Sequence, residues 1–180
     1  MAALIAIDPG PTRSAMVTIR SRTDISGELI ENDELLKKLR ALCRQQQIGK
    51  DNFTLVVEMI ASYGMPVGAE VFETCVMIGR VEEIWHPDPV VKIFRQEVKR
   101  RLCHDTRAND ANVRMEIINR FGGKEAAIGL TKKRGPLYGF HADLWAALAV
   151  GMTYLDQRQL TPVEWSDKAI GQAAMRGLVG

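Results

Sequence analysis

The sequence predicts an α/β fold in which one mixed β-sheet is flanked by helices. Two short apolar runs, residues 3–7 and 53–57, have the length and β-branched content of buried strands. Later segments instead repeat their apolar residues with the period of a helix, most clearly at 69–85 and 141–155. Because strands and helices alternate along the chain, a single sheet with helices packed on it is the favoured arrangement. A length of 180 residues suits one domain with a substantial core.

The first third of the chain predicts a hairpin, a third strand and a helix. Residues 3–7 run into Asp8-Pro9-Gly10-Pro11, where two prolines and a glycine force a turn. Residues 14–19 partly alternate between apolar and polar, so they are expected to pair with the first strand. A third strand is plausible at 24–30. Asn32 can then cap a helix that carries leucines 35, 36, 39 and 42 on one face.

The remaining elements are separated by glycine, proline and basic residues. Residues 53–57 form a second buried strand that ends at Glu58, and a Gly/Pro loop follows at 63–68. We then expect a helix from Ala69 to Trp85, a strand from Val90 to Phe94, a helix at 110–121 that stops at Gly122, a basic loop at 129–139, and an Ala-rich helix at 141–155. The sequence Thr161-Pro162-Val163-Glu164 is a capping box. It predicts a short helix, which makes residues 159–180 a helical extension of a domain at 1–158.

Charge is distributed unevenly, although the net charge is only +2. The segment from Lys92 to Arg134 holds twelve Lys or Arg and five Asp or Glu, so the rest of the chain is acidic overall. A polarised basic segment favours a polyanionic partner, because Lys and Arg displace counterions from phosphates. The alternative is a solvated helix face. An odd number of cysteines without a CxxC pattern, and no apolar run long enough for a signal peptide, favour a cytoplasmic location.

Three acidic residues occupy the ends of predicted elements. Asp8 and Glu58 each follow a buried strand, and Asp143 opens the Ala-rich helix. If the two strands are parallel neighbours, their carboxylates lie close together and repel each other unless a cation is bound between them. Carboxylate oxygens select Mg²⁺ or Mn²⁺ over zinc. Taken singly, Asp8 can be a turn-forming residue, Glu58 a surface residue and Asp143 a helix-dipole partner, and His141 can be a capping or packed histidine.

Four stretches, in order, resemble RuvC-type Holliday junction resolvases: LIAIDPGPTRSAMV, LVVEMIASYG with the following helix, RQEVK at 95–99, and HADLWAALAV. The resemblance implies an RNase H-like fold, a homodimer, and a Mg²⁺-dependent endonuclease that cuts branched DNA, with Mn²⁺ able to substitute. It implies Asp8, Glu58 and Asp143 as catalytic acids, with Lys99 matching an active-site lysine. The metal ligands implied are Asp8, Glu58, Asp143 and His141. The DNA contacts expected are Tyr63, Arg95, Arg100, Arg101, Arg107, Lys132, Lys133 and Arg134.

The chain departs from this family in two places. The family commonly spaces its last two ligands three residues apart, whereas His141 and Asp143 are two apart. Bacterial members tend to carry an aromatic residue three positions after the second acid, where this chain has Ala61 and the nearest aromatic is Tyr63. The basic loop and the C-terminal tail look more like divergent phage resolvases, which would place the protein in a host cytoplasm.

Three other functions fit parts of the pattern. An RNA-processing nuclease of the YqgF type shares the Asp-Pro-Gly hairpin, but such chains are usually shorter and fit the basic 92–107 stretch less well. A nucleotide-binding protein of the actin and sugar-kinase type also uses this hairpin, but it needs two such domains. A non-catalytic DNA-binding module gives no reason for Asp8, Glu58 and Asp143 to coincide.

Overall fold

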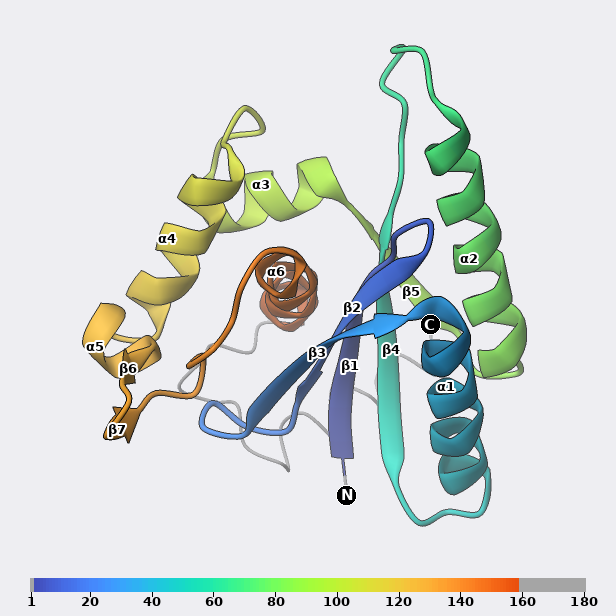
Figure 1. Cartoon of the computed structure of the whole chain (residues 1–180), viewed down its shortest axis with the longest axis horizontal. Coiled ribbons are helices and arrows are strands. Elements are labelled where there is room, and N and C mark those ends of the chain that lie inside the picture. Colours follow the sequence, from blue (N-terminus) through green and yellow to red (C-terminus); the bar gives the residue numbers. More distant parts are fainter. Residues whose placement is uncertain (1, 159–180) are drawn as a thin grey trace.

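The computed structural model describes residues 2–158, and the expected terminal extension at 159–180 lies outside them. Five strands form the main sheet in the order β3-β2-β1-β4-β5 (Figure 1). They are β1 (Ala2–Asp8), β2 (Arg13–Ile19), β3 (Ile25–Glu31), β4 (Asn52–Met59) and β5 (Val90–Phe94). The first three strands pair antiparallel, whereas β4 is parallel to β1 and β5 is parallel to β4. The mixed α/β sheet that the sequence predicts is therefore confirmed.

Helices cover both faces of this sheet. One face packs against α1 (Asn32–Gln47) and α2 (Ala69–Trp85). The other packs against α6 (Asp143–Gln157), with α3 (Arg95–Cys103) and α4 (Asp110–Arg120) outside it (Figure 1). The alternation of a strand explains the two cores, since Ile5 and Ile7 of β1 join the α1–α2 side while Leu4 joins the α6 side.

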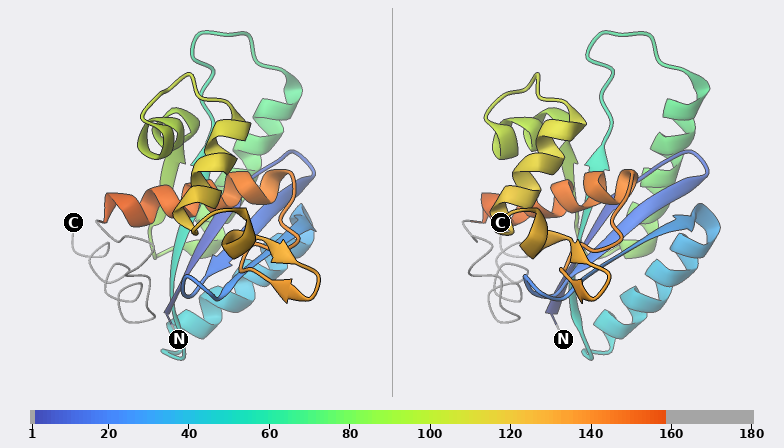
Figure 2. Two further views of the ribbon diagram at one scale, coloured as in Figure 1. Left: turned by 90° about the vertical axis from the view of Figure 1, so that its left-hand side faces the viewer. Right: turned by 60° about the vertical axis from the view of Figure 1, so that its left-hand side comes forward.

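Helix α6 approaches the sheet closely and crosses it (Figure 2). The reason is the small residues on its inner face. A side chain at Gly151 would come within 2.9 Å of Ile19 and 3.1 Å of Ala6, so only glycine fits at that contact. The helix is buried along almost its whole length. Its first residue, Asp143, is consequently held at a fixed place relative to the strand ends.

The region after β5 contains more structure than the sequence suggests. The stretch expected as a basic segment leading into a helix is itself a helix, α3, which begins directly after β5. Its signal was the spacing of Val98 and Leu102, both buried, with Glu97 accepting a hydrogen bond from the Phe94 N–H at 2.9 Å. The expected basic loop includes a small hairpin that projects from the fold, formed by β6 (Gly129–Leu130) and β7 (Lys133–Arg134) (Figure 2). A one-turn helix, α5 (Lys124–Ala127), precedes it.

The prediction that Asn32 caps α1 is wrong. The N-cap is Glu31, and no side chain caps the helix. The Asn32 amide instead donates to the carbonyl oxygens of Gly10 and Pro11, at 3.0 and 3.1 Å, and accepts from the Ser14 hydroxyl at 2.7 Å. Asn32 is buried, so its polar atoms satisfy buried backbone groups of the hairpin turn rather than the helix end. The described helices include none that is long and apolar enough to cross a membrane.

Candidate active site

The carboxyl ends of β1 and β4 bring Asp8 and Glu58 together. The parallel register pairs Ile7 with Val57, so the next residue on each strand is an acid. Both acids follow residues whose neighbours alternate between the two cores, and both therefore face the α6 side of the sheet with Leu4 and Val56. The sequence predicts this juxtaposition only if the two strands are parallel neighbours, and the topology meets that condition.

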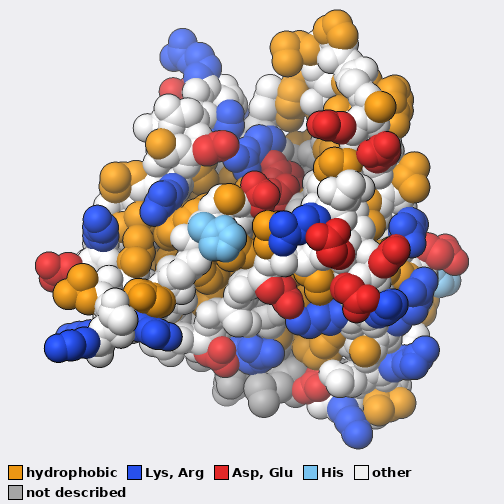
Figure 3. Space-filling model, in the orientation of Figure 1, with side chains coloured by type: hydrophobic (Ala, Val, Ile, Leu, Met, Phe, Trp, Pro, Cys, Tyr) orange, Lys and Arg blue, Asp and Glu red, His pale blue; other side chains and the backbone are white. Residues whose placement is uncertain are grey.

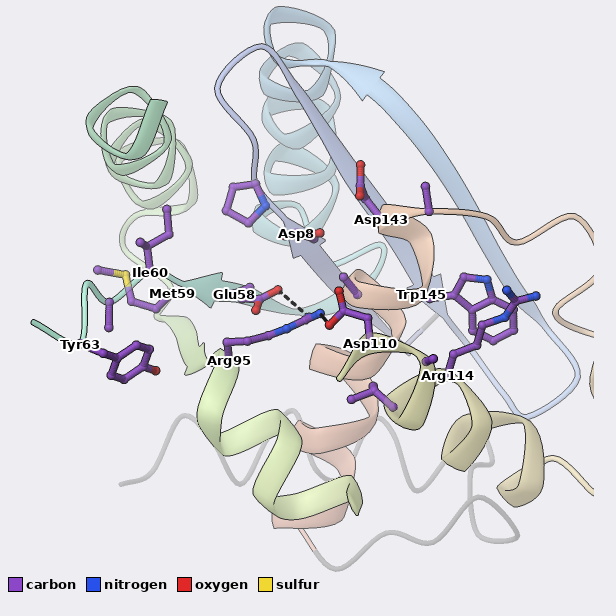
Figure 4. Close-up of a pocket in the computed structure, with 16 residues that line it drawn as sticks. Asp8, Glu58, Met59, Ile60, Tyr63, Arg95, Asp110, Arg114, Asp143 and Trp145 are labelled. Carbon is purple, nitrogen blue, oxygen red and sulfur yellow. Dashed lines mark hydrogen bonds and ion pairs between the residues drawn. The ribbon is translucent and has the colours of Figure 1, made fainter. Parts of the chain in front are cut away.

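These two acids lie in a cavity of about 770 Å³ (Figure 4). Its walls come from the β1 turn, the β4–α2 loop, and the first turns of α3, α4 and α6. Figure 3 shows acidic and basic side chains side by side in this hollow, between the surface over α4 and the surface over the β4–α2 loop. The lining residues that carry charge or an aromatic ring are Asp8, Glu58, Tyr63, Arg95, Asp110, Arg114, Asp143 and Trp145.

Arg95 is bound between two acids of the cavity. One of its guanidinium nitrogens lies 3.4 Å from Oε2 of Glu58, and another donates to Oδ1 of Asp110 (Figure 4). The Glu58 side chain is 11% exposed and that of Asp110 is 79% exposed, so Arg95 joins an inner acid to an outer one. Two buried carboxyl groups, Asp8 and Glu58, therefore share one nearby guanidinium.

This shortage of positive charge shows in the protonation of the pair. Burial raises the pKa of Asp8 to about 8, and the negative charges of Glu58 and Asp143 add to the rise while Arg95 opposes it. Burial also raises the pKa of Glu58, against the lowering effect of Arg95 and of a hydrogen bond from Asp8. The Asp8 carboxyl group thus donates to Glu58 at neutral pH, and one proton stands where a cation would otherwise balance the pair.

The donor set fits a hard divalent cation. Asp8 and Glu58 offer adjacent carboxylate oxygens that are buried and short of positive charge, and Mg²⁺ or Mn²⁺ prefers such oxygens. Across residues 2–158, no three His, Cys, Asp or Glu side chains come close enough to share one ion. Asp8 and Glu58 would therefore form the core of a site, and Asp143 would have to approach them to complete it.

The turn that carries Asp8 is fixed from below. A side chain at Gly10 would come within 2.4 Å of the Arg13 carbonyl oxygen, so this position of the turn requires glycine. The Gly10 N–H donates to the Ser14 hydroxyl at 3.4 Å, and Ser14 in turn donates to Asn32. Residues of β2 and α1 thereby hold the Asp-Pro-Gly turn, and the aspartate with it, in one position.

Asp143 lies at the cavity, but His141 does not. Asp143 is the first residue of α6 and lines the cavity near Asp8 (Figure 4). His141 is exposed and is absent from the residues that line it. Between them, Ala142 has φ +40°, a conformation that is strained for a residue with a side chain. This sharp turn directs the chain into α6, with the Leu144 N–H donating to the His141 carbonyl at 3.0 Å.

The other residues expected at the site are spread over a wider area. Tyr63 lines the cavity at the end away from Trp145 and is 52% exposed (Figure 4). Lys99 is half-buried on α3, one turn beyond Arg95, and is not part of the lining. Arg101 contacts Asp156, and Arg107 contacts Asp105. Arg100, Lys132, Lys133 and Arg134 are exposed, and Arg134 stacks over the Tyr138 ring at 4.7 Å.

Sequence reasoning missed three lining residues, Asp110, Arg114 and Trp145. Arg114 lies 4.8 Å above the Trp145 ring, and the Trp145 indole donates to the Phe140 carbonyl at 3.2 Å. A cation over an indole face is held there electrostatically. The one signal in the sequence was the position of Asp110 at a helix start, which is equally typical of dipole complementation.

Comparison with known proteins supports the fold through structure and not through sequence. Neither a protein-family model nor a curated protein sequence matches the chain. Among solved structures, it is similar to the Thermus thermophilus RuvC structure, with TM-score 0.60 and 17% identity, covering 87% of this chain and 95% of that one. It is similar to T. thermophilus RuvC in complex with Holliday junction substrate, with TM-score 0.59 and 17% identity, covering 88% and 96%. The resemblance inferred from the sequence is thus confirmed in three dimensions, and the chain has the RNase H-like fold of the RuvC structures.

Proposed function

We propose that this protein is a metal-dependent endonuclease that cleaves branched DNA, with four-way junctions as its main substrate. The observation that carries the proposal is the Asp8–Glu58 pair, two buried carboxyl groups at adjacent strand ends with one guanidinium between them and the solvent. Such a pair costs stability unless it has a use. A similar fold is found in a RuvC structure that contains a Holliday junction substrate.

In this proposal, Asp8 and Glu58 hold Mg²⁺, or Mn²⁺ in its place, and Asp143 completes the ligand set from the start of α6. The bound metal would supply an activated water molecule and stabilise the charge on the scissile phosphate. The chain itself keeps the carboxylates oriented, through the Gly10 turn and the Asn32 contacts. His141 is the fourth ligand that the family pattern implies. Its exposure makes it a ligand only if the backbone at Ala142 rearranges.

The DNA would lie across the cavity and along the α3–β7 side of the molecule. Lys132 and Lys133 project on the β6–β7 hairpin and make no ion pair within residues 2–158, so they can meet phosphates without losing a partner. Arg100 is similarly exposed on α3. Arg101 and Arg107 already contact Asp156 and Asp105, and for them the phosphate has to compete. Lys99 would add positive charge beside the cavity.

Tyr63 is proposed to stack on a base that is unpaired at the junction centre. It has φ +47°, is half-exposed, and is followed by Gly64 with φ +82°, so the loop presents the ring into the cavity mouth. Such a contact is worth roughly 1–3 kcal/mol per base. Fluorescence of a base analogue at the crossover should change when the wild type binds, and an equal change with Tyr63→Ala would exclude stacking.

Resolution by two symmetric nicks needs two active sites, and we propose a twofold homodimer. Helix α2 and the loop before it expose an unusual number of large apolar side chains: Tyr63, Met65, Val67, Phe72 and Val76. Phe72 and Val76 are 61% and 64% exposed and lie four residues apart, on one face of α2. A second copy of the chain would cover this face. Sedimentation should show a dimer that Phe72→Asp converts to monomer.

The function is tested by incubating the protein with labelled four-way junction, duplex and single-stranded DNA, with and without Mg²⁺. Paired, symmetric nicks in the junction alone, dependent on Mg²⁺, are the expected result. Cleavage of structured RNA in preference to the junction would favour the RNA-processing alternative. Junction binding without cleavage under any divalent cation would leave only a binding module.

A further inference from the structure

Arg95 stands where a divalent cation would need space. Its guanidinium is within 3.4 Å of a Glu58 oxygen, and only about a quarter of the side chain is exposed. A metal held by Asp8 and Glu58 would need the same Glu58 oxygens. Two cations a few ångströms apart in a partly buried cavity repel strongly. Arg95 in its present position and a bound metal are therefore in competition.

The structure also contains an acceptor for a displaced arginine. Asp110 begins α4, and its Oδ1 already accepts from the second nitrogen of Arg95. The contact with Glu58 is at the long limit of a hydrogen bond, whereas the contact with Asp110 is short. Arg95 can thus give up Glu58 while it keeps Asp110, with a rotation of its side chain and no movement of α3 or α4.

We propose that Arg95 is an internal counter-cation that holds Glu58 while the site is metal-free and withdraws onto Asp110 when a metal binds. The inference rests on the proposed metal site and deepens it by naming two positioning residues outside the ligand set. Arg95 keeps the cavity from presenting an uncompensated negative charge, and Asp110 lowers the cost of removing that arginine. Neither residue needs to contact the metal.

The two partners of this one ion pair should have opposite effects on metal binding. Mn²⁺ binding to the DNA-free protein is measured at pH 8 from the electron paramagnetic resonance signal of free Mn²⁺. Arg95→Gln removes the competitor and should tighten binding by about three- to tenfold. Asp110→Asn removes the acceptor, leaves Arg95 on Glu58, and should weaken binding by about two- to fivefold.

A double variant separates this mechanism from simple long-range electrostatics. If Asp110 acts by attracting Arg95, then Asp110→Asn should have little effect when Arg95 is already Gln. If Asp110 merely adds negative charge near the metal, its effect persists and the two changes are additive. Arg80→Gln and Asp33→Asn are the matched controls, because that Arg–Asp pair, at 3.2 Å, lies outside the cavity between α2 and α1. Neither should change Mn²⁺ binding.

Thermal unfolding gives a readout that is independent of activity. Arg95→Gln should lower the melting temperature in EDTA but much less in saturating Mn²⁺, because the metal replaces the missing charge. An equal decrease in both conditions, additive effects in the double variant, or weaker Mn²⁺ binding by Arg95→Gln would overturn the proposal while leaving the metal site intact. If the wild type binds no Mn²⁺ and shows no Mg²⁺-dependent cleavage, both this proposal and the proposed function are wrong.

Discussion

The two ends of helix α6 hold opposite charge balances. At its start, Asp143 adds a third acid to the buried Asp8–Glu58 pair, which has Arg95 as its nearby cation. At its end, Asp156 is contacted by both Arg120 and Arg101. The second cluster is electrically satisfied and links α6 to α3 and α4. The first is deficient in positive charge, as expected of a site built to receive a cation rather than to stabilise the fold.

The largest expected effect is on cleavage at the first end. Asp8→Asn and Glu58→Gln should each lower the rate of junction cleavage by about 10³-fold or more, because removing a metal ligand removes several kcal/mol of transition-state stabilisation. Junction binding, measured by gel shift, should persist. Asp156→Asn is the control at the other end of α6 and should cleave at a rate near that of wild type. Full activity of Asp8→Asn with Mg²⁺ would remove the metal assignment.

Asp143 and His141 sharpen the comparison within the first end. Asp143→Asn should lower cleavage by about 10²-fold, because its carboxylate lines the cavity at the helix start, where the helix dipole favours a negative charge. His141→Ala should stay within about threefold of wild type, since the side chain is exposed outside the cavity. A large loss with His141→Ala that is greater at pH 6 than at pH 8 would instead identify the histidine as a ligand, because protonation competes with metal.

Stability should change with opposite signs at the two ends. The folded protein keeps the Asp8 proton up to a pKa of about 8, whereas the unfolded chain loses it near 4. Rising pH between these values therefore favours unfolding, and the metal-free protein should lose stability across this window. Asp8→Asn removes that penalty and should stabilise the metal-free protein at pH 8 by about 1–3 kcal/mol.

At the other end of α6, Asp156→Asn should cost about 1–3 kcal/mol, because it leaves two arginines without their shared acid. Urea unfolding in EDTA at pH 5 and pH 8 measures both variants against wild type. Equal stability of Asp8→Asn and wild type at pH 8 would show that the carboxyl pair carries no burial penalty.

The smallest effect concerns the projecting hairpin. Replacing Lys132, Lys133 and Arg134 together by Ala should weaken binding to all branched DNAs alike. It should also make the dependence of log affinity on log salt shallower, by about one unit for each DNA phosphate that the variant no longer neutralises. Cleavage of bound junction should not change. An unchanged slope would place the DNA elsewhere on the molecule.

The sequence by itself determined the elements whose signals are local. Apolar runs and helical spacing located the five strands, the helix from Ala69 to Trp85 and the Ala-rich helix, because burial imposes these periods on any chain. The same reasoning put Asp8 and Glu58 at strand ends. It failed for α3, where three basic residues from Lys99 to Arg101 obscured a short helix that buries only Val98 and Leu102.

Only the tertiary structure decided how the site is balanced. Arg95 reaches Glu58 across 37 residues of sequence and Asp110 across 15, and Asn32 reaches back 22 residues to Gly10. Nothing in the spacing of these residues predicts the contacts, since each depends on which strands are neighbours and how α3 and α4 turn after β5. Local periodicity fixes which face of an element is buried, but the pairing of buried charges depends on the long-range packing that brings those faces together.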